Sequence, residues 1–252
     1  MKQIFVGSVI RTKLHTDIRN SVLPPHIAQT IIIALLIIIP WAFASRIFTA
    51  KNGDYSNVVL VTTLRGTGSA IYVGNQYLLT AAHVVQEMQV GDKCDIEFQD
   101  PNSSPIKSVP LQAELVTSGK FLPAKNIEED YALLRILYVD ASNLAKACPF
   151  GFAAKAKIQD NISVEGYPNG VYSSTVGTIN NLNGGVTESS KILVVSANAW
   201  GGNSGGALKS ANGDMLGIVT MGGTVVGKTA GQTYVLKIDD IRNKLKGYGL
   251  PF

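Results

Sequence analysis

Short apolar runs separated by glycine, asparagine and other turn formers make up most of the chain after residue 55. Many of these runs are rich in β-branched residues, which favour strands. Turn signals return roughly every 8–12 residues, a spacing typical of β-sandwiches and β-barrels. The pattern predicts an all-β fold with strands at residues 58–61, 69–73, 77–80, 95–98, 131–136, 162–165, 192–196, 215–220 and 233–237, and one short helix at 239–245.

A different pattern precedes these strands, because residues 27–45 carry no charged side chain and 31–39 are almost entirely aliphatic. As a helix, this segment would reach about 28 Å, close to the thickness of a bilayer core. The alternative is a buried helix of a soluble domain, but a helix that is apolar on every side is unusual beside a basic flank. We therefore predict a transmembrane anchor or signal segment at 27–45.

Basic residues before this segment predict its orientation. Lysine and arginine are concentrated in residues 1–26, so the positive-inside rule leaves this end in the cytoplasm and exports residues 46–252 to the periplasm or the extracellular side. Ala42, Phe43 and Ala44 resemble a signal-peptidase site with cleavage before Ser45. The preceding region is long for a signal peptide, which favours an uncleaved anchor, and the folded part is exported in both cases.

Composition excludes several classes of protein. With 46% apolar and 16% charged residues, the chain is too hydrophobic to be disordered. Most of its net charge of +4 lies before residue 45, so the folded part lacks the basic footprint of a nucleic-acid-binding protein. Cys94 and Cys148 could pair outside the cytoplasm or remain as two buried thiols. One exported histidine and two scattered cysteines do not form a metal site, and we predict no cofactor.

The strongest chemical signal is the sequence GNSGG at residues 202–206, which places Ser204 between glycines. Glycines allow a tight turn and a close approach of substrate, and the amides of Gly202 and Ser204 could converge on a developing oxyanion. The alternative is an ordinary glycine-rich loop. A serine nucleophile needs a base, and His83, in the sequence LLTAAHVV, is the one histidine after the apolar segment.

A histidine base in turn needs a carboxylate to orient it. Asp130 directly precedes the strand predicted at 131–136, so its side chain is the one expected to enter the interior. We expect Glu128 and Glu129 to be solvated loop charges, and Asp140, after the strand, is the second candidate for the acid.

The order of TAAH, DYALLRI and GNSGG along the chain is similar to that of the chymotrypsin-fold, trypsin-like serine endopeptidases. The stretches GTGS at 66–69, GYPNG at 166–170, GTI at 177–179 and the end at 235–241 resemble the HtrA/Deg branch more narrowly. This resemblance covers roughly residues 58–245. It implies two six-stranded β-barrels, at about 55–140 and 158–238, with a catalytic triad of His83, Asp130 and Ser204 at their junction.

The resemblance also implies how substrate binds. Asn198 would lie near the base of the specificity pocket, where the absence of a carboxylate argues against a preference for Lys or Arg. We expect a small or medium apolar residue before the scissile bond. Thr220, Met221 and Gly222 would form a strand that pairs with the substrate backbone.

Two departures from the family limit what can be carried over. Asn203 stands where digestive relatives have aspartate, so activation by a newly formed N-terminal amine is not expected, and HtrA relatives share this asparagine. We also expect no PDZ domain of the kind usual in the HtrA branch after Phe252, so regulation and assembly through such a domain are not expected either. Nothing in the sequence indicates an oligomer.

These features predict a serine endopeptidase that hydrolyses exported polypeptides through an acyl-enzyme. The alternative is a catalytically inert protease-fold module that binds or senses a ligand. An esterase is a weaker alternative, because esterases with this nucleophile usually place the serine before the acid and the histidine in the chain.

Overall fold

The computed structural model describes residues 55–122, 126–184, 191–222 and 231–251. The segment predicted to cross a membrane, 27–45, lies outside these residues. Among the residues that are described, no helix has both the length and the apolar character needed to span a bilayer.

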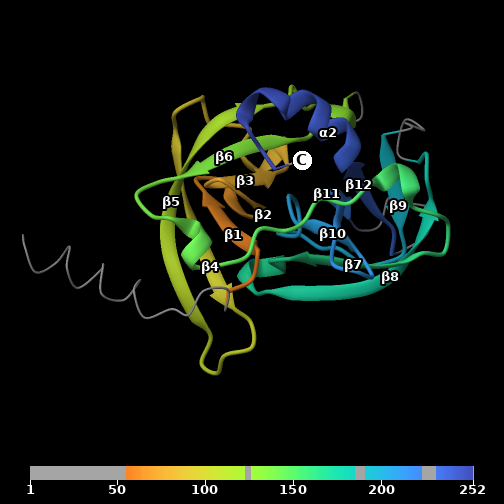
Figure 1. Cartoon of the computed structure of the whole chain (residues 1–252), viewed down its shortest axis with the longest axis horizontal. Helices are drawn as coiled ribbons and strands as arrows, with labels where there is room; N and C mark the ends of the chain where they lie inside the picture. The colour runs from red at the N-terminus through yellow and green to blue at the C-terminus, as the bar shows by residue number, and fades with distance from the viewer. Residues whose placement is uncertain (1–54, 123–125, 185–190, 223–230, 252) are drawn as a thin grey trace, which may run out of the picture. The chain divides into compact units, whose positions relative to one another are not determined.

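Six antiparallel strands close the first barrel, in the order β1-β2-β3-β6-β5-β4 (Figure 1). Each strand pairs with the next around the ring, and β1 closes the barrel against β4 through the partners Leu60–Glu97 and Thr62–Asp95. The strands are β1 (Val58–Thr63), β2 (Gly66–Gly74), β3 (Tyr77–Thr80), β4 (Lys93–Asp100), β5 (Lys107–Ser118) and β6 (Ala132–Ile136).

Six further strands close a second barrel beside the first, in the order β10-β11-β12-β9-β8-β7. A short helix, α2 (Ile238–Leu245), follows its last strand. The predicted all-β fold with two six-stranded barrels and a C-terminal helix is therefore confirmed. The strands of this barrel are β7 (Asn161–Gly166), β8 (Ser173–Asn181), β9 (Ile192–Val195), β10 (Ala207–Ser210), β11 (Met215–Gly222) and β12 (Thr233–Lys237).

All nine predicted strands overlap observed ones, whereas β5, β8 and β10 were not predicted. β5 contains Pro110 and several polar residues, and β8 is polar with a glycine in its middle. β10 has only four residues. Each of these strands is hydrogen-bonded to two neighbouring strands, because a closed barrel leaves no edge unpaired. These bonds, and not an apolar pattern of its own, determine its conformation.

Apolar side chains from both barrels form one continuous core. Val58, Ile71 and Leu133 of the first barrel are fully buried in the same cluster as Val164 and Leu208 of the second. Separate buried residues, including Phe98 and Leu134, fill the rest of the first barrel. The barrels are thus held against each other mainly by apolar burial, which is strong but carries little directional information.

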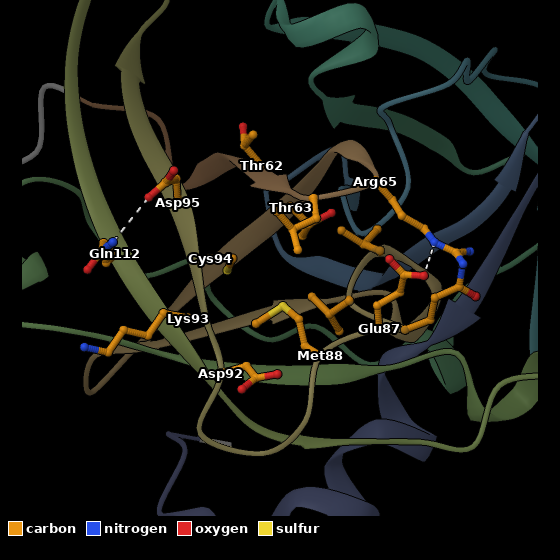
Figure 2. Close-up of a pocket in the computed structure, with 14 residues that line it drawn as sticks. Thr62, Thr63, Arg65, Glu87, Met88, Asp92, Lys93, Cys94, Asp95 and Gln112 are labelled. Carbon is orange, nitrogen blue, oxygen red and sulfur yellow. Dashed lines mark hydrogen bonds and ion pairs between the residues drawn. The ribbon is translucent and has the colours of Figure 1, made fainter.

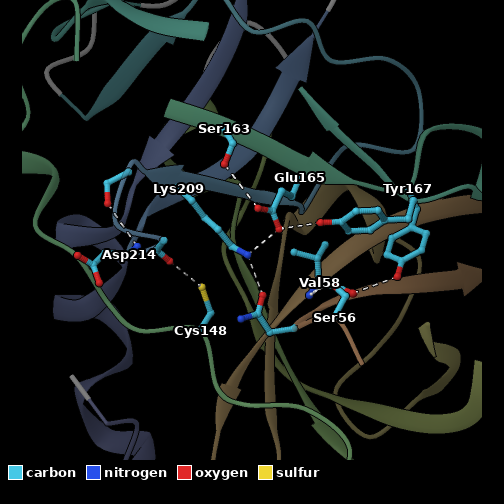
Figure 3. A network of polar contacts seen from close by, with 12 residues as sticks. Ser56, Val58, Cys148, Ser163, Glu165, Tyr167, Lys209 and Asp214 are labelled. Carbon is cyan, nitrogen blue, oxygen red and sulfur yellow. Dashed lines mark hydrogen bonds and ion pairs between the residues drawn. The ribbon is translucent and has the colours of Figure 1, made fainter. Parts of the chain in front are cut away.

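A nearly buried polar network adds direction to this apolar contact (Figure 3). Lys209 on β10 forms an ion pair of 2.6 Å with Glu165 on β7 and donates across the junction to Asn57, just before β1, at 2.9 Å. Tyr172 donates to Glu165 at 3.1 Å, and the hydroxyl of Tyr167 donates to the carbonyl of Val58 at 3.1 Å. These bonds specify one alignment of the two barrels.

Cys94 and Cys148 are both buried and both free, so of the two alternatives the structure has the pair of thiols and not the disulfide. Burial raises the pKa of Cys94 to about 12 and that of Cys148 to about 11. Both thiols are therefore protonated at neutral pH and unsuited to act as nucleophiles.

Candidate active site

His83 lies at the end of the first barrel that faces the second barrel. It occupies the middle of a single 3₁₀ turn (Ala82–Val84) that begins just after β3. Ala81 and Ala82 are buried, so the small residues before the histidine let the chain turn within the core. The imidazole itself is 26% exposed, and the ring of Phe121 packs against it at a centroid distance of 5.5 Å. The ring is thus partly accessible but restricted in orientation.

Asp130 is completely buried, and among the described residues its carboxylate forms hydrogen bonds with His83 alone. Its Oδ2 lies 2.8 Å from His83 Nδ1 and its Oδ1 lies 3.0 Å from the same nitrogen. Oδ1 also accepts the backbone N–H of His83 at 2.9 Å. A buried carboxylate requires such donors, and as an acceptor it selects the tautomer with the proton on Nδ1. That tautomer leaves a lone pair on Nε2, as a general base needs.

The neighbouring acidic residues have other roles. Asp140 accepts the amide and hydroxyl of Ser142 and caps a short turn, so its side chain serves that turn. The hydrogen bonds from Ser142 lower the pKa of Asp140.

The expectation that Glu128 and Glu129 are solvated loop charges was wrong. Glu129 forms an ion pair with Lys244 of α2, and Glu128 forms one with Lys191 at 2.8 Å. Both glutamates lie on the short turn (Ile127–Glu129) that leads into Asp130. The second barrel and its C-terminal helix therefore help to fix the segment that delivers Asp130.

The turn that carries Ser204 packs directly against the strands that lead to His83. The amide of Ser69, on β2, donates to the carbonyl of Ser204 at 2.8 Å. A Cβ on Gly205 would lie 2.1 Å from the carbonyl oxygen of Ser69 and 3.0 Å from the amide of Ala81, so only glycine fits there. Ser204 and His83 thus lie on opposite sides of the same junction. Within the described part of the chain, the Ser204 hydroxyl makes no hydrogen bond to the His83 ring.

Two amides of this turn remain available to a ligand. The carbonyl of Gly201 accepts the amide of Asn169 at 3.1 Å, and the carbonyl of Asn203 accepts the amide of Gly206 at 2.9 Å. Because a trans peptide is planar, the following N–H groups, those of Gly202 and Ser204, point in the opposite directions. Neither has an acceptor among the described residues, so both could donate to an oxyanion.

The strand predicted to bind substrate has an unpaired edge. β10 pairs with β11 only as far as Ala207 and Ile218, whereas β12 continues to pair with Met221 and Gly222. On the β10 side, the backbones of Gly205 and Gly206 still bond to Val219, and among the described residues no strand pairs with β11 beyond that point. Thr220 is buried there and donates to the carbonyl of Tyr234 at 3.2 Å, while Met221 is exposed. An extended peptide could be added at this edge.

Asn198 is exposed, and its side chain faces Gly231, where an added Cβ would lie 2.8 Å from Asn198 Oδ1. The hydroxyl of Thr175 donates to the carbonyl of Asn198 at 2.9 Å. Asn203, by contrast, is buried beneath the Ser204 turn, and its Oδ1 has no hydrogen-bond partner among the described residues. The position taken by aspartate in digestive relatives is thus occupied here by a neutral side chain.

A cavity of about 610 Å³ lies outside this constellation, beside the first barrel (Figure 2). It is bounded by the turn between β1 and β2 and by the segment after His83, and its wall includes the Arg65–Glu87 ion pair and the side chain of Met88. His83, Asp130 and Ser204 do not line it. The described ranges also contain no group of three or more His, Cys, Asp or Glu side chains that could hold a metal.

The sequence did not identify Ser69 or Asn169 as contributors to the Ser204 turn. Both act on backbone carbonyls of that turn, which carry no side-chain signal. The asparagine in the GYPNG stretch was one available hint, because Asn169 has a positive φ of 53°, a conformation that asparagine tolerates.

Comparison with known proteins gives a consistent result. The family model described as a trypsin-like peptidase domain matches residues 66–218. The inactive form of the Rv3671c protease is 22% identical, covers 77% of this chain and 89% of that one, and has a TM-score of 0.54. A serine-to-alanine mutant of Rv3671c from M. tuberculosis H37Rv, also an inactive form, gives 22% identity, coverage of 77% and 86%, and a TM-score of 0.53.

The HtrA-type protease AlgW, solved with a tripeptide, is also 22% identical and has a TM-score of 0.57. The match covers 82% of this chain and 64% of that one. At this level of identity, these structures establish a shared fold.

Proposed function

Because the chain belongs to the trypsin-like peptidase domain family, we propose that it is a serine endopeptidase acting through His83, Asp130 and Ser204. The observation that carries the proposal is the contact of 2.8 Å between His83 Nδ1 and the buried carboxylate of Asp130. A fully buried acid with its short contacts on one partly exposed imidazole is the arrangement that a general base requires.

In the first half of the reaction, Ser204 Oγ attacks the carbonyl carbon of the scissile peptide while His83 Nε2 accepts its proton. The bond from carbon to oxygen becomes single, and the oxyanion receives hydrogen bonds from the amides of Gly202 and Ser204. Asp130 stabilises the imidazolium through Nδ1–H. His83 then gives its proton to the departing amine, the C–N bond breaks and an acyl-enzyme remains.

In the second half, water replaces the amine. His83 takes a proton from the water, whose oxygen attacks the ester carbonyl of the acyl-enzyme. The second tetrahedral oxyanion uses the same two amides. Its collapse returns the proton from His83 to Ser204 Oγ and releases the carboxylic acid product.

The open edge of β11 supports an extended polypeptide as substrate. A peptide that pairs with residues 220–222 would form main-chain hydrogen bonds and run past the Ser204 turn. Asn198 near Gly231 supplies no negative charge, which supports an uncharged residue, small or medium and apolar, before the scissile bond.

The alternative is an inert protease-fold module. It is favoured by one observation, the absence of a hydrogen bond between the Ser204 hydroxyl and the His83 ring in the described part of the chain. Catalytic hydrogen bonds of ligand-free enzymes often tighten only when substrate binds, so we retain the peptidase as the leading proposal.

Labelling with a fluorophosphonate separates the two, because the reagent modifies a serine only when it is activated. We expect one label per full-length chain, at Ser204, and none in the Ser204→Ala or His83→Ala variants. Casein turnover should fall by a factor on the order of 10⁶ in either variant. A chain that folds but takes no label at Ser204 would establish the inert module.

We also propose that residues 27–45 anchor the protein in a membrane with the peptidase outside the cytoplasm. The uncharged aliphatic run and its basic N-terminal flank support this proposal. Mass spectrometry of the mature protein tests it, since an intact N-terminus in the membrane fraction agrees with an anchor and a new terminus at Ser45 indicates cleavage.

A further inference from the structure

Ser69 joins the first barrel to the Ser204 turn through both its backbone amide and its hydroxyl. It is completely buried on β2. Its amide donates to the carbonyl of Ser204 at 2.8 Å, and its own carbonyl accepts the hydroxyl of Thr80 at 2.7 Å. Its hydroxyl donates to the carbonyl of Gly202 at 2.7 Å and accepts the amide of Tyr167 at 2.9 Å.

We propose that the Ser69 hydroxyl is a positioning residue that sets the orientation of the two oxyanion-binding amides and thereby the rate of acyl transfer. This inference rests on the proposed peptidase function. Ser69 would touch neither the substrate nor the reacting atoms, and would act through the backbone of the turn.

The Ser69 hydroxyl has this role because of the position of the carbonyl that it bonds to, that of Gly202. The peptide between Gly202 and Asn203 separates the two amides that would bind the oxyanion, so its orientation relates one donor to the other. Backbone amides hold the carbonyls of Gly201, Asn203 and Ser204, and no side-chain substitution removes those bonds. The carbonyl of Gly202 is held by a side chain, and Gly202 has a φ of 99° and no Cβ to oppose rotation.

The packing around Ser69 fixes the hydroxyl in place. A Cβ on Gly166 would lie 3.0 Å from Ser69 Oγ and 2.5 Å from Asn203 Oδ1, so the bare backbone of glycine leaves room for both polar atoms. The amide of Tyr167, the residue after Gly166, supplies the second bond to the hydroxyl. Because Tyr167 and Gly202 belong to the second barrel, the hydroxyl aligns the turn with both barrels at once.

Ser69→Ala removes both bonds of the hydroxyl and leaves the Gly202 carbonyl without its donor. Oxyanion donors act mainly in the transition state, so kcat should fall while KM changes little. Losing an oxyanion donor outright costs a factor of about 10²–10³ in kcat. Loosening the donors through a neighbouring peptide should cost less, about tenfold to a hundredfold.

The test compares full-length wild type, Ser69→Ala and Ser69→Cys with the matched control Tyr167→Phe. The control removes another fully buried hydroxyl bond between the same two barrels, from Tyr167 to the carbonyl of Val58, and leaves the turn intact. Each protein is measured for kcat and KM on a peptide substrate and for inhibition by a peptide trifluoromethyl ketone. Ser204 adds reversibly to this ketone and creates a tetrahedral oxyanion, so binding of the ketone reports the amides directly.

We expect Ser69→Ala to lose about tenfold to a hundredfold in kcat and a similar factor in ketone affinity, with KM and the pH profile unchanged. Tyr167→Phe should stay within about threefold of wild type in kcat, KM and ketone affinity, and its pH profile should be unchanged. Ser69→Cys keeps the size and offers a weaker donor, so it should lose less than alanine, and it decides the question if Ser69→Ala does not fold.

If the wild type takes the fluorophosphonate label but the Ser69 variants behave like Tyr167→Phe, the role of Ser69 alone is overturned. A wild type that takes no label would overturn the peptidase proposal and the role of Ser69 together.

Discussion

Replacing Asp130 with asparagine tests the proposed base most directly, because the change keeps the shape and removes only the charge and one acceptor. Asp130 Oδ1 accepts the backbone N–H of His83 at 2.9 Å, so the amide oxygen of an asparagine is held at that position. Its NH₂ group then replaces Oδ2, which lies 2.8 Å from His83 Nδ1. An NH₂ group donates, so Nδ1 must become the acceptor and the ring proton moves to Nε2.

The consequence is a histidine in the wrong tautomer for catalysis. A protonated Nε2 has no lone pair to take the proton of Ser204, and the imidazolium loses its counter-charge. The loss of kcat expected from such a change is about 10⁴-fold, or about 5.4 kcal/mol in the activation barrier. The fold should be preserved, because a neutral group replaces a buried charge at the same volume.

The assay measures kcat and KM on a peptide substrate at neutral pH, with thermal unfolding recorded for each protein. Asp140→Asn is the control, because Asp140 belongs to the same region but its carboxylate, within the described part of the chain, bonds to Ser142 alone. We expect Asp140→Asn to keep nearly full activity. A folded Asp130→Asn protein with kcat within tenfold of wild type would refute the reasoning, since it would mean that the buried carboxylate does not set the tautomer.

Three further predictions concern the interior. Lys209→Met leaves the charge of Glu165 without its partner, and the Glu165 side chain is only 14% exposed. The variant should therefore lose about 3 kcal/mol of unfolding free energy in urea, and adding Glu165→Gln should restore part of it. No loss in the single variant would contradict the role of the pair. Cys94 and Cys148, with pKa values raised by burial to about 12 and about 11, should resist iodoacetamide at pH 8 until the protein unfolds, when two thiols per chain react. Rapid alkylation of the native protein would contradict the burial of these thiols. Since burial favours the protonated thiols, the free energy of unfolding should also fall as pH rises from about 9 towards these pKa values, which urea unfolding at several pH values measures.

The strands were predictable wherever their side chains carried the information. β2, β3 and β11 are apolar runs bounded by turns, so each was found from its sequence. β5 and β8 were missed because their residues are polar or include proline or glycine, and their neighbours in the closed barrels determine their conformation. The sequence therefore predicts the barrel architecture better than it predicts each individual strand.

The candidate site divides in the same way. His83 and Asp130 were identified because each residue type is chemically restricted, and the structure brings them into contact across 47 residues of sequence. Glu128 and Glu129 were misjudged because their cationic partners lie far along the chain, on α2 and before β9. Ser69 was noted only as part of the GTGS stretch and not as a contributor to the site, because a serine within a strand is ordinary until the carbonyl opposite it is known.

Apolar contacts and hydrogen bonds contribute differently at the barrel junction, and this difference explains why a residue such as Ser69 matters. Apolar burial supplies most of the free energy that holds the barrels together, but two apolar surfaces can slide by fractions of an ångström at little cost. An oxyanion site tolerates much less displacement, since its donors must lie about 2.7–3.1 Å from the developing charge. The hydrogen bonds of Ser69 to Gly202, Ser204 and Tyr167 connect the barrels at the point where this accuracy is needed. Lys209, held by its ion pair with Glu165 within the second barrel, connects the barrels further away through its bond to Asn57, so its loss should lower stability more than the rate, whereas loss of the Ser69 hydroxyl should do the reverse.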